Sequence, residues 1–263
     1  MSSPHPPAHP PVGTLLREWR QRRRRSQLDL ALDAEVSTRH LSYVESGRAS
    51  PSREMVLRLA AQLDVPLRAR NTLLLAAGYA PAYREDAAME GVREALQMIL
   101  DAQAPNPALA VDRHWQLVAA NAVLPKLLAG LDAALLAPPV NVLRLSLHPA
   151  GLAARIANLS EWRAHVLERL HRQVEASGDP VLADLLAGLR ALPAPPPSAP
   201  SSPGLAPGGV VVPLLLDSAA GRLALLSTTT VFGTPVEVTL SELAIEAFYP
   251  ADAETAARLR ALA

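Results

Sequence analysis

The apolar and polar positions of the first 79 residues have the spacing of short α-helices separated by polar breaks. The first helix carries Leu15, Leu16 and Trp19 as an apolar stripe and ends in the run "RQRRRR". The second helix has the capping-box pair Ser26 and Asp29 at its start. The pattern predicts five helices: one from residue 13, one over 27–34, one after Ser37, one over 53–63 and one over 66–77.

The pattern changes after residue 80. A helical segment around residues 87–101 is followed by two short strands within 109–121, joined by a tight turn at 112–114. Asn121 has the position of a helix cap. Helical patterns return over residues 121–130, 151–178 and 179–192, three strands are expected over 210–217, 222–233 and 235–240, and a last helix starts near Pro250. This part is therefore predicted to be α+β, with a sheet of about five strands.

These elements suggest a division into four parts. We expect a disordered tail over residues 1–11, an all-α domain over 12–80, a connecting helix over 81–104 and an α+β domain over 105–263. The stretch "PAPPPSAPSSPGLAPGG" at 193–209 is of low complexity and is expected to be a mobile loop within the second domain.

The formal net charge of zero conceals a difference between the two parts of the chain. Residues 1–84 contain 13 Arg and 7 acidic residues, a net charge of 13 − 7 = +6. The remaining residues contain 12 Lys or Arg and 18 acidic residues, a net charge of 12 − 18 = −6. A basic helical domain suits a partner with a phosphate backbone, and guanidinium groups suit forked contacts with phosphate and guanine.

Composition and motifs argue against several other classes. The chain has no Cys and no apolar run of the roughly 18 residues needed to cross a bilayer, and its Pro-rich start lacks the apolar segment of a secretory signal. We therefore expect a cytoplasmic protein that has no membrane partner. Phosphate-loop, dinucleotide-binding and nucleophile-elbow motifs are absent from the sequence, and the seven His are scattered. We expect no enzyme, no metal site and no tightly held cofactor.

The second and third predicted helices have the spacing of a helix-turn-helix. Ala31 falls where two steeply crossing helices need a small residue, and Val36, Leu41 and Val44 fall at inward positions of the third helix. The outward positions then carry the polar side chains Thr38, Arg39, Ser42 and Tyr43.

The stretch "SQLDLALDAEVSTRHLSYVESGRASPSREMVLRLAAQLDV", residues 26–65, resembles the Xre-type (Cro/repressor) helix-turn-helix family. The resemblance implies that the third helix enters the major groove of double-stranded DNA. Carried over by position, it assigns phosphate or backbone contacts to Gln27 and Arg48. It places Thr38, Arg39 and Tyr43 at base edges, beside Ser42 and with Ser37 at the helix start. Arg20 and Glu45 match a pair that forms a salt bridge in the family.

Two features of this region leave questions open. The family usually has Gly at the corner between the second and third helices, where this chain has Glu35. A non-Gly residue with positive φ would cost about 1 kcal/mol there. The "RQRRRR" run either contacts phosphates or is a solvated helix end stabilised by the helix dipole.

The stretches "RNTLLLAAGYAPAYRE", "VDRHWQLVAANAV", "NVLRLSLHPAGLAARIANLSEWRAHVLERLHRQ" and "STTTVFGTPVEVTLSELAIEAFYPADAETAARLR" resemble MmyB-like transcription regulators. The resemblance implies a PAS-like sensory domain with an aliphatic pocket for a fatty acid or similar apolar ligand. An acidic ligand would need a polar anchor. Arg144, His148, Trp162 and Asn141 are the candidates in these stretches, and Arg144 and His148 would share a face if their segment is helical.

Alternatives to a ligand-sensing second domain remain at this point. The Leu-, Ala- and Val-rich residues could instead form a closed core, and the domain would then serve as a ligand-free module for dimerisation or for contacts with a co-regulator. One recognition helix touches only a few base pairs, so a homodimer on a palindromic site is expected.

Overall fold

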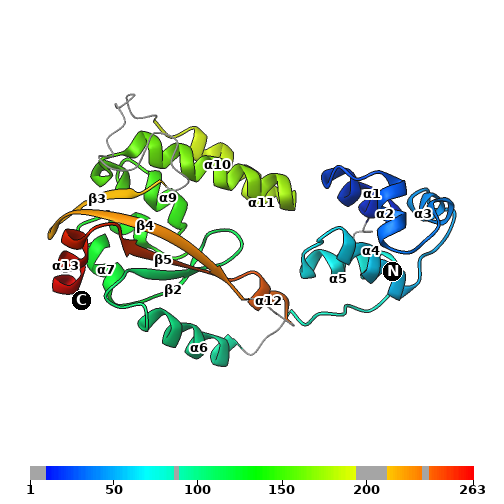
Figure 1. Cartoon of the computed structure of the whole chain (residues 1–263), viewed down its shortest axis with the longest axis horizontal. Helices are drawn as coiled ribbons and strands as arrows, with labels where there is room; N and C mark the ends of the chain where they lie inside the picture. The colour runs from blue at the N-terminus through cyan, green and yellow to red at the C-terminus, as the bar shows by residue number, and fades with distance from the viewer. Residues whose placement is uncertain (1–9, 86–88, 194–211, 233–236) are drawn as a thin grey trace, which may run out of the picture. The chain divides into compact units, whose positions relative to one another are not determined.

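The computed structural model describes residues 10–85, 89–193, 212–232 and 237–263, and the chain divides into two compact units (Figure 1). One unit contains the N-terminal helices together with a short helix from much later in the chain, and the other contains the remaining elements. Most of the expected tail and of the expected 193–209 loop lies outside the described residues.

The five helices predicted for the N-terminal unit are present. They are α1 (Val12–Arg22), α2 (Gln27–Asp33), α3 (Thr38–Glu45), α4 (Arg53–Gln62) and α5 (Leu67–Ala76). Ser26, Ser37 and Ser52 cap α2, α3 and α4, because each hydroxyl oxygen accepts a hydrogen bond from the backbone N–H three residues later. Buried leucines from all five helices, among them Leu16, Leu30, Leu41, Leu59 and Leu73, form one core.

Residues 82–85, which we call the strap, pack against α5 and complete this unit. The buried side chain of Asn71 in α5 accepts hydrogen bonds from the backbone N–H groups of Ala82 and Tyr83 and donates one to Tyr83 O. The strap then pairs with a distant segment, because Val238 N donates to Arg84 O at 3.0 Å. That segment forms the short helix α12 (Val238–Ser241), which packs against α5.

The strand predicted over residues 235–240 is therefore wrong. Glu237 forms a single β-bridge with Arg84, and the chain then turns into α12, where Ser241 N donates to Glu237 O. The β-branched residues of this stretch suit a strand, but their contacts with α5 and the strap determine the structure.

The second unit is built on one antiparallel sheet. Its strands are β1 (Ala108–Val111), β2 (Leu117–Ala120), β3 (Leu214–Ser218), β4 (Gly221–Val231) and β5 (Ala244–Pro250), in the order β2-β1-β5-β4-β3. The predicted hairpin of β1 and β2 and the expected number of strands are confirmed. The last strand is β5, which follows α12 in the chain.

Helices surround this sheet (Figure 1). They are α6 (Met89–Asp101), α7 (Val123–Leu128), α8 (Ala133–Leu136), α9 (Val142–Leu147), the 3₁₀-helix η1 (Leu152–Arg155), α10 (Leu159–Ser177), α11 (Pro180–Arg190) and α13 (Ala253–Leu262). The helix expected to connect the two parts, α6, packs against β1 and β2. The long helices α10 and α11 pack against each other, and α13 packs against β4 and β5. The α+β class expected for this part is thus present.

Asn121 does not cap a helix as the sequence suggested. Its side-chain oxygen accepts a hydrogen bond from Ala108 N, and its amide group donates to Leu100 O and Asn106 O. The residue is 2% exposed, and its hydrogen bonds tie the ends of α6 and β1 to β2. A buried amide satisfied in this way holds the hairpin against α6.

Candidate functional site

The first candidate site is the outer face of α3. Leu41 and Val44 are buried, as the helix-turn-helix spacing predicted, and Ala31 of α2 is 1% exposed. On the opposite face Arg39 is exposed, while Thr38, Ser42 and Tyr43 are partly exposed. The Ser37 hydroxyl accepts from His40 N at 3.1 Å and fixes the first turn of the helix. This face therefore presents polar side chains to solvent at fixed helical positions.

Tyr43 contacts two arginines, Arg39 of α3 and Arg48 of the turn that follows it. Arg39 Nε donates to the Tyr43 hydroxyl at 3.1 Å, and the Arg39 guanidinium lies 5.4 Å from the centre of the Tyr43 ring. The Arg48 guanidinium lies 5.9 Å from the same ring. Each distance is within the range of a cation–π contact. The ring thus contacts two guanidinium groups of exposed arginines, for which phosphate oxygens and guanine edges are suitable acceptors.

A buried ion pair fixes α3 to α1. Glu45 is 3% exposed, and its two carboxylate oxygens accept hydrogen bonds from Arg20 Nε at 2.7 Å and Arg20 Nη2 at 2.8 Å. Gln27 Nε2 also donates to Glu45, at 2.8 Å, and Arg17 Nε lies 3.6 Å from the same carboxylate. Gln27 was expected to contact a DNA phosphate, and in the structure its side-chain amide already donates one hydrogen bond to Glu45.

This network controls the charge of Glu45. Burial alone would raise the pKa of its carboxyl group, but the hydrogen bonds from Arg20 and Gln27 and the positive charges of Arg20 and Arg17 outweigh burial. The pKa of Glu45 therefore lies below its ordinary value. The pKa of Arg20 is raised, mainly by its hydrogen bond to Glu45.

The corner between α2 and α3 has the strained geometry expected from the sequence. Glu35 has φ +54°, a conformation in which Gly is favoured over every residue with a Cβ atom. Its backbone N–H donates to Leu32 O, and Val36 N donates to Ala31 O, so the turn closes with glutamate at the position. The turn between α2 and α3 thus forms with a non-Gly residue at its corner.

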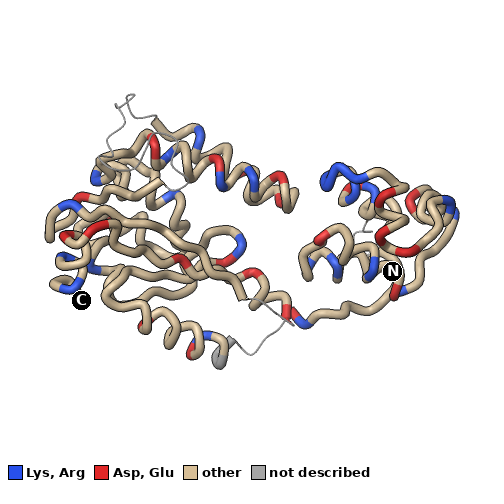
Figure 2. Tube along the Cα trace, viewed as in Figure 1, with Lys and Arg blue, Asp and Glu red and all other residues tan. Residues whose placement is uncertain are grey.

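The arginine run at the end of α1 has a structural role that the sequence left undecided. Arg23 donates to Leu63 O at 2.9 Å and to Asp64 O at 3.0 Å, and Arg25 donates to Gln62 O and to Asp33. These carbonyls lie at the C-terminal end of α4, where cations are favoured by the helix dipole. Figure 2 shows Lys and Arg positions, in blue, gathered where Figure 1 labels α1. Arg24 is exposed with φ +54° and remains a candidate for phosphate contact.

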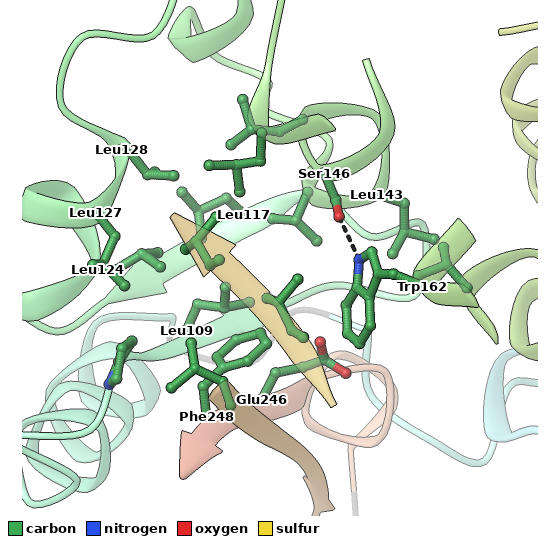
Figure 3. Close-up of a pocket in the computed structure, with 18 of the residues that line it drawn as sticks. Leu109, Leu117, Leu124, Leu127, Leu128, Leu143, Ser146, Trp162, Glu246 and Phe248 are labelled. Atoms are coloured by element: carbon green, nitrogen blue, oxygen red, sulfur yellow. Dashed lines mark hydrogen bonds between the residues drawn. The ribbon is translucent and has the colours of Figure 1, made fainter. Parts of the chain in front are cut away.

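The second candidate site is a cavity in the second unit. It lies between the sheet and helices α7, α9 and α10 and has a volume of about 80 Å³, several times the roughly 10–15 Å³ that one water molecule needs. In Figure 3, Leu124, Leu127 and Leu128 lie on one side, with Trp162 and Leu143 on the other. Its apolar lining residues are Pro107, Leu109, Leu117, Leu124, Leu127, Leu128, Val142, Leu143, Leu145, Leu152, Trp162, Val166, Leu214, Leu216, Leu225 and Phe248.

Polar side chains gather at one end of this cavity. They are Ser146 of α9, His165 and Arg169 of α10, and Glu246 of β5. Glu246 is 6% exposed and accepts hydrogen bonds from Arg169 Nη2 at 2.5 Å and Thr229 Oγ1 at 3.1 Å. In Figure 3 the Glu246 carboxylate points toward the Trp162 side of the cavity. An apolar volume with a few convergent polar groups is the usual form of a small-molecule site.

Trp162 and His165 form part of that polar end. Trp162 Nε1 donates to Ser146 Oγ at 2.9 Å, and the Trp162 and His165 rings stack with centres 5.6 Å apart. Partial burial lowers the pKa of His165, as do the charges of Arg169 and Arg172, against a smaller opposite effect of Glu246. The imidazole is therefore neutral near pH 7.

The four ligand-site residues expected from the sequence are not all near this cavity. Trp162 lines it. Asn141 and Arg144 line a second, more polar hollow that also contains His114, Gln116 and Asp184, and the buried Gln116 Oε1 has no hydrogen-bond partner among the described residues. Asn141 is the N-cap of α9, where its side chain accepts from Arg144 N. His148 is the C-cap of that helix and lies one turn after Arg144, to whose carbonyl oxygen its backbone N–H donates at 2.9 Å, and it is not among the lining residues of either hollow.

Glu246 and Arg169 were missed by sequence reasoning. A local signal for Glu246 exists: it is the single acid in "AIEAFYP", at an inward position two residues before Phe248. That signal depends on placing the last strand at residues 244–250. Arg169 lies 77 positions earlier, on a helix whose other charged residues are exposed or partly exposed.

Metal binding and membrane insertion find no support in the described parts of the chain. Within residues 10–85, 89–193, 212–232 and 237–263, no three His, Asp or Glu side chains are arranged to hold a metal ion. None of the helices in these ranges is long and apolar enough to cross a bilayer.

Comparison with protein families accounts for both sites. Residues 16–69 match the helix-turn-helix family, and these residues include α2, α3 and the buried Arg20–Glu45 pair. Residues 92–262 match the ligand-binding domain of MmyB-like transcription regulators, and these residues include the cavity and its polar end. No curated protein matches the chain. A helix-turn-helix joined to this domain makes the chain a DNA-binding transcription regulator with a ligand-binding C-terminal region, and it belongs to the MmyB-like transcription regulator family.

Proposed function

We propose that this regulator binds a specific DNA sequence as a homodimer in the cytoplasm, and that its PAS-like C-terminal unit senses a small apolar, fatty-acid-like ligand. The observation that carries the proposal is the cavity, which is apolar along most of its wall and polar at one end. An acyl chain with a polar head group has the same distribution of chemistry.

The DNA-binding half of the proposal rests on α3. Its outer face places Arg39, Tyr43 and Arg48 together, and the Arg20–Glu45 pair fixes the helix from behind. Arg39 is the residue we assign to base reading, because its guanidinium can bind guanine O6 and N7 in a fork. Arg48 and Gln27 are assigned to the phosphate backbone, with Ser37, Thr38 and Ser42 beside the bases.

A homodimer is proposed on geometric grounds. Helix α3 has eight residues, and a single helix of this length reaches only a few base pairs in the major groove. Two copies on a palindromic site would double the contacts and raise specificity. Size-exclusion chromatography with light scattering, with and without duplex DNA, tests this part of the proposal.

The ligand-binding half rests on the unfilled core. Residues of the apolar core of this unit line the cavity, so an apolar ligand would replace missing contacts rather than displace existing ones. Leucine side chains form most of the wall, and they can change rotamer to follow an acyl chain. A ligand bound there would add its binding free energy to the stability of this unit.

The ligand is sought by extraction. The purified protein is treated with organic solvent, and the extract is analysed by mass spectrometry for an acyl compound. Leu128→Trp, at a partly buried position in the cavity wall, should reduce the amount recovered, whereas Met98→Trp, at an exposed position of α6, should not. Equal recovery from the wild type and both variants would show that any extracted lipid lies elsewhere. An empty extract, together with no effect of added acyl compounds on melting temperature or DNA protection, would reject the ligand-sensing proposal.

A further inference from the structure

The polar end of the cavity contains balanced charges. Arg169 and Glu246 are the charged lining residues, and each is the ion-pair partner of the other. The third titratable lining residue, His165, is neutral near pH 7 because of burial and the neighbouring arginines. A bound anion would therefore find a positive charge that is already neutralised and a carboxylate that repels it.

Two groups at this end of the cavity are left to hydrogen-bond a ligand: one carboxylate oxygen of Glu246, as an acceptor, and the hydroxyl of Ser146, as a donor. Glu246 Oε1 accepts from both Arg169 and Thr229, while Glu246 Oε2 has no hydrogen-bond partner among the residues that the structure describes. A carboxylate oxygen can only accept hydrogen bonds, so a ligand atom beside it must be a donor. The Ser146 hydroxyl accepts from Trp162 Nε1 and keeps its own proton free to donate.

We propose that the cavity selects an amphiphile whose head group is uncharged and donates a hydrogen bond to Glu246 Oε2. This inference rests on the proposed ligand site and narrows its chemistry. An alcohol or primary amide meets both conditions, whereas a fatty acid meets them only in its protonated form. A simple ester is uncharged but has no donor.

Three probes share a ten-carbon chain and differ in whether the head group is charged and whether it can donate a hydrogen bond. They are decan-1-ol, methyl decanoate and decanoic acid. Binding to the full-length protein is measured by isothermal titration calorimetry at pH 7.5. Decan-1-ol should bind about tenfold or more tightly than methyl decanoate, because the ester offers Glu246 Oε2 no hydrogen-bond donor. Decanoic acid, almost entirely ionised at this pH, should bind more weakly than decan-1-ol.

The pH dependence gives a second test on the unmodified protein. A carboxylic acid that binds only when protonated loses affinity about tenfold for each pH unit above its pKa. Between pH 6 and pH 8, decanoic acid should follow this slope, and decan-1-ol should change little. The charged or titratable groups at this end are Arg169 and His165, with Arg172 further along α10, and Glu246 from the sheet. Burial and the charges of Arg169 and Arg172 lower the pKa of His165, which favours the neutral imidazole.

Variants that change the charge of the Arg169–Glu246 pair test whether this pair causes the selection for an uncharged head group. Glu246→Gln leaves Arg169 without its partner, so the affinity for decanoate at pH 7.5 should rise about tenfold and its pH dependence should flatten. Glu246→Gln combined with Arg169→Gln restores zero charge and should abolish that gain. Far-UV circular dichroism and thermal melting establish that each variant folds, and the wild-type pH series decides the matter if one does not.

The outcomes are distinct. If none of the three probes binds, the proposed ligand site is rejected, and this inference fails with it. If decanoate binds as tightly as decan-1-ol at pH 7.5 without a pH slope, the ligand site stands and the selection for an uncharged head group is wrong. Equal binding of the alcohol and the ester would overturn the requirement for a donor.

Discussion

Arg20 of α1 and Glu45 of α3 form a two-point ion pair in the core of the DNA-binding unit, with N–O distances of 2.7 Å and 2.8 Å. Arg20→Ala leaves a carboxylate with 0% side-chain exposure without its main partner. We expect the unfolding free energy to fall by about 3–5 kcal/mol, the usual effect of breaking a buried pair. Thermal unfolding of the full-length protein measures the loss. Arg17→Ala, at a side chain with 47% exposure, should cost less than about 1 kcal/mol.

The same pair predicts a pH dependence. The pKa of Glu45 is lowered in the folded state, so its ionised form stabilises the fold at pH values above the unfolded pKa of about 4.3. That contribution is lost as the pH falls through the lower, folded pKa. The difference in melting temperature between the wild type and Glu45→Gln should therefore be largest near neutral pH and should shrink in acid. A difference that stayed constant down to pH 3 would show that charge is not the source of the stabilisation.

The exposed face of α3 predicts two classes of variant. Arg39→Ala should relax the preferred sequence at one position, with a loss of discrimination of about 1–3 kcal/mol, because a forked contact with guanine is removed. Arg48→Ala should weaken all sites to a similar degree. Selection from random duplexes followed by fluorescence anisotropy measures both effects. Arg172→Ala, an exposed arginine of the second unit with the same change in charge, is the matched control. An unchanged sequence preference and affinity for Arg39→Ala would contradict the proposed orientation of α3.

Phosphate contacts also predict a strong dependence on salt. The logarithm of the association constant should fall linearly with the logarithm of salt concentration, because each arginine that binds a phosphate releases condensed counterions. Arg48→Ala should reduce that slope by about one, and Arg23→Ala should not, because Arg23 donates to the carbonyls of Leu63 and Asp64. Anisotropy titrations at several salt concentrations measure the slopes. Affinity that does not vary with salt would argue against binding along the phosphate backbone.

The corner residue offers a test of backbone strain. Glu35 is exposed and has φ +54°, so Glu35→Gly should relieve strain and raise the unfolding free energy by up to about 1 kcal/mol. Glu35→Ala keeps a Cβ atom at the same backbone position and should bring no comparable gain. Chemical denaturation of the three proteins measures the differences. A destabilised glycine variant would mean that the flexibility glycine adds to the unfolded chain outweighs the strain relieved in the turn.

The N-terminal unit could be predicted in detail because its signals are local. Serines precede three helices, and the apolar spacing from Ala31 to Val44 lies within one helix-turn-helix. Even the strained corner at Glu35 was visible, because a single position departs from a known pattern.

The ligand cavity could be predicted only in outline. Its aliphatic character follows from composition, but its polar end joins Arg169 on a helix to Glu246 on a strand 77 positions later. Local patterns also placed the last strand at residues 235–240 instead of 244–250, because the contacts that turn residues 238–241 into α12 come from distant segments. Candidate anchors chosen by proximity in sequence, such as Asn141 and Arg144, line a different hollow.

Helix α12 limits how the DNA-binding unit can be dissected. Val238 N and the Thr239 hydroxyl donate to the carbonyl oxygens of Arg84 and Glu85, so a fragment that stops near residue 85 exposes two acceptors and the surface of α5 that α12 covers. A DNA-binding unit truncated in this way would be less stable than the same helices in the intact chain. A chimaera that exchanges DNA-binding units between related regulators would have to include two stretches of sequence, the N-terminal helices and the segment of α12, which begins about 150 residues after the strap.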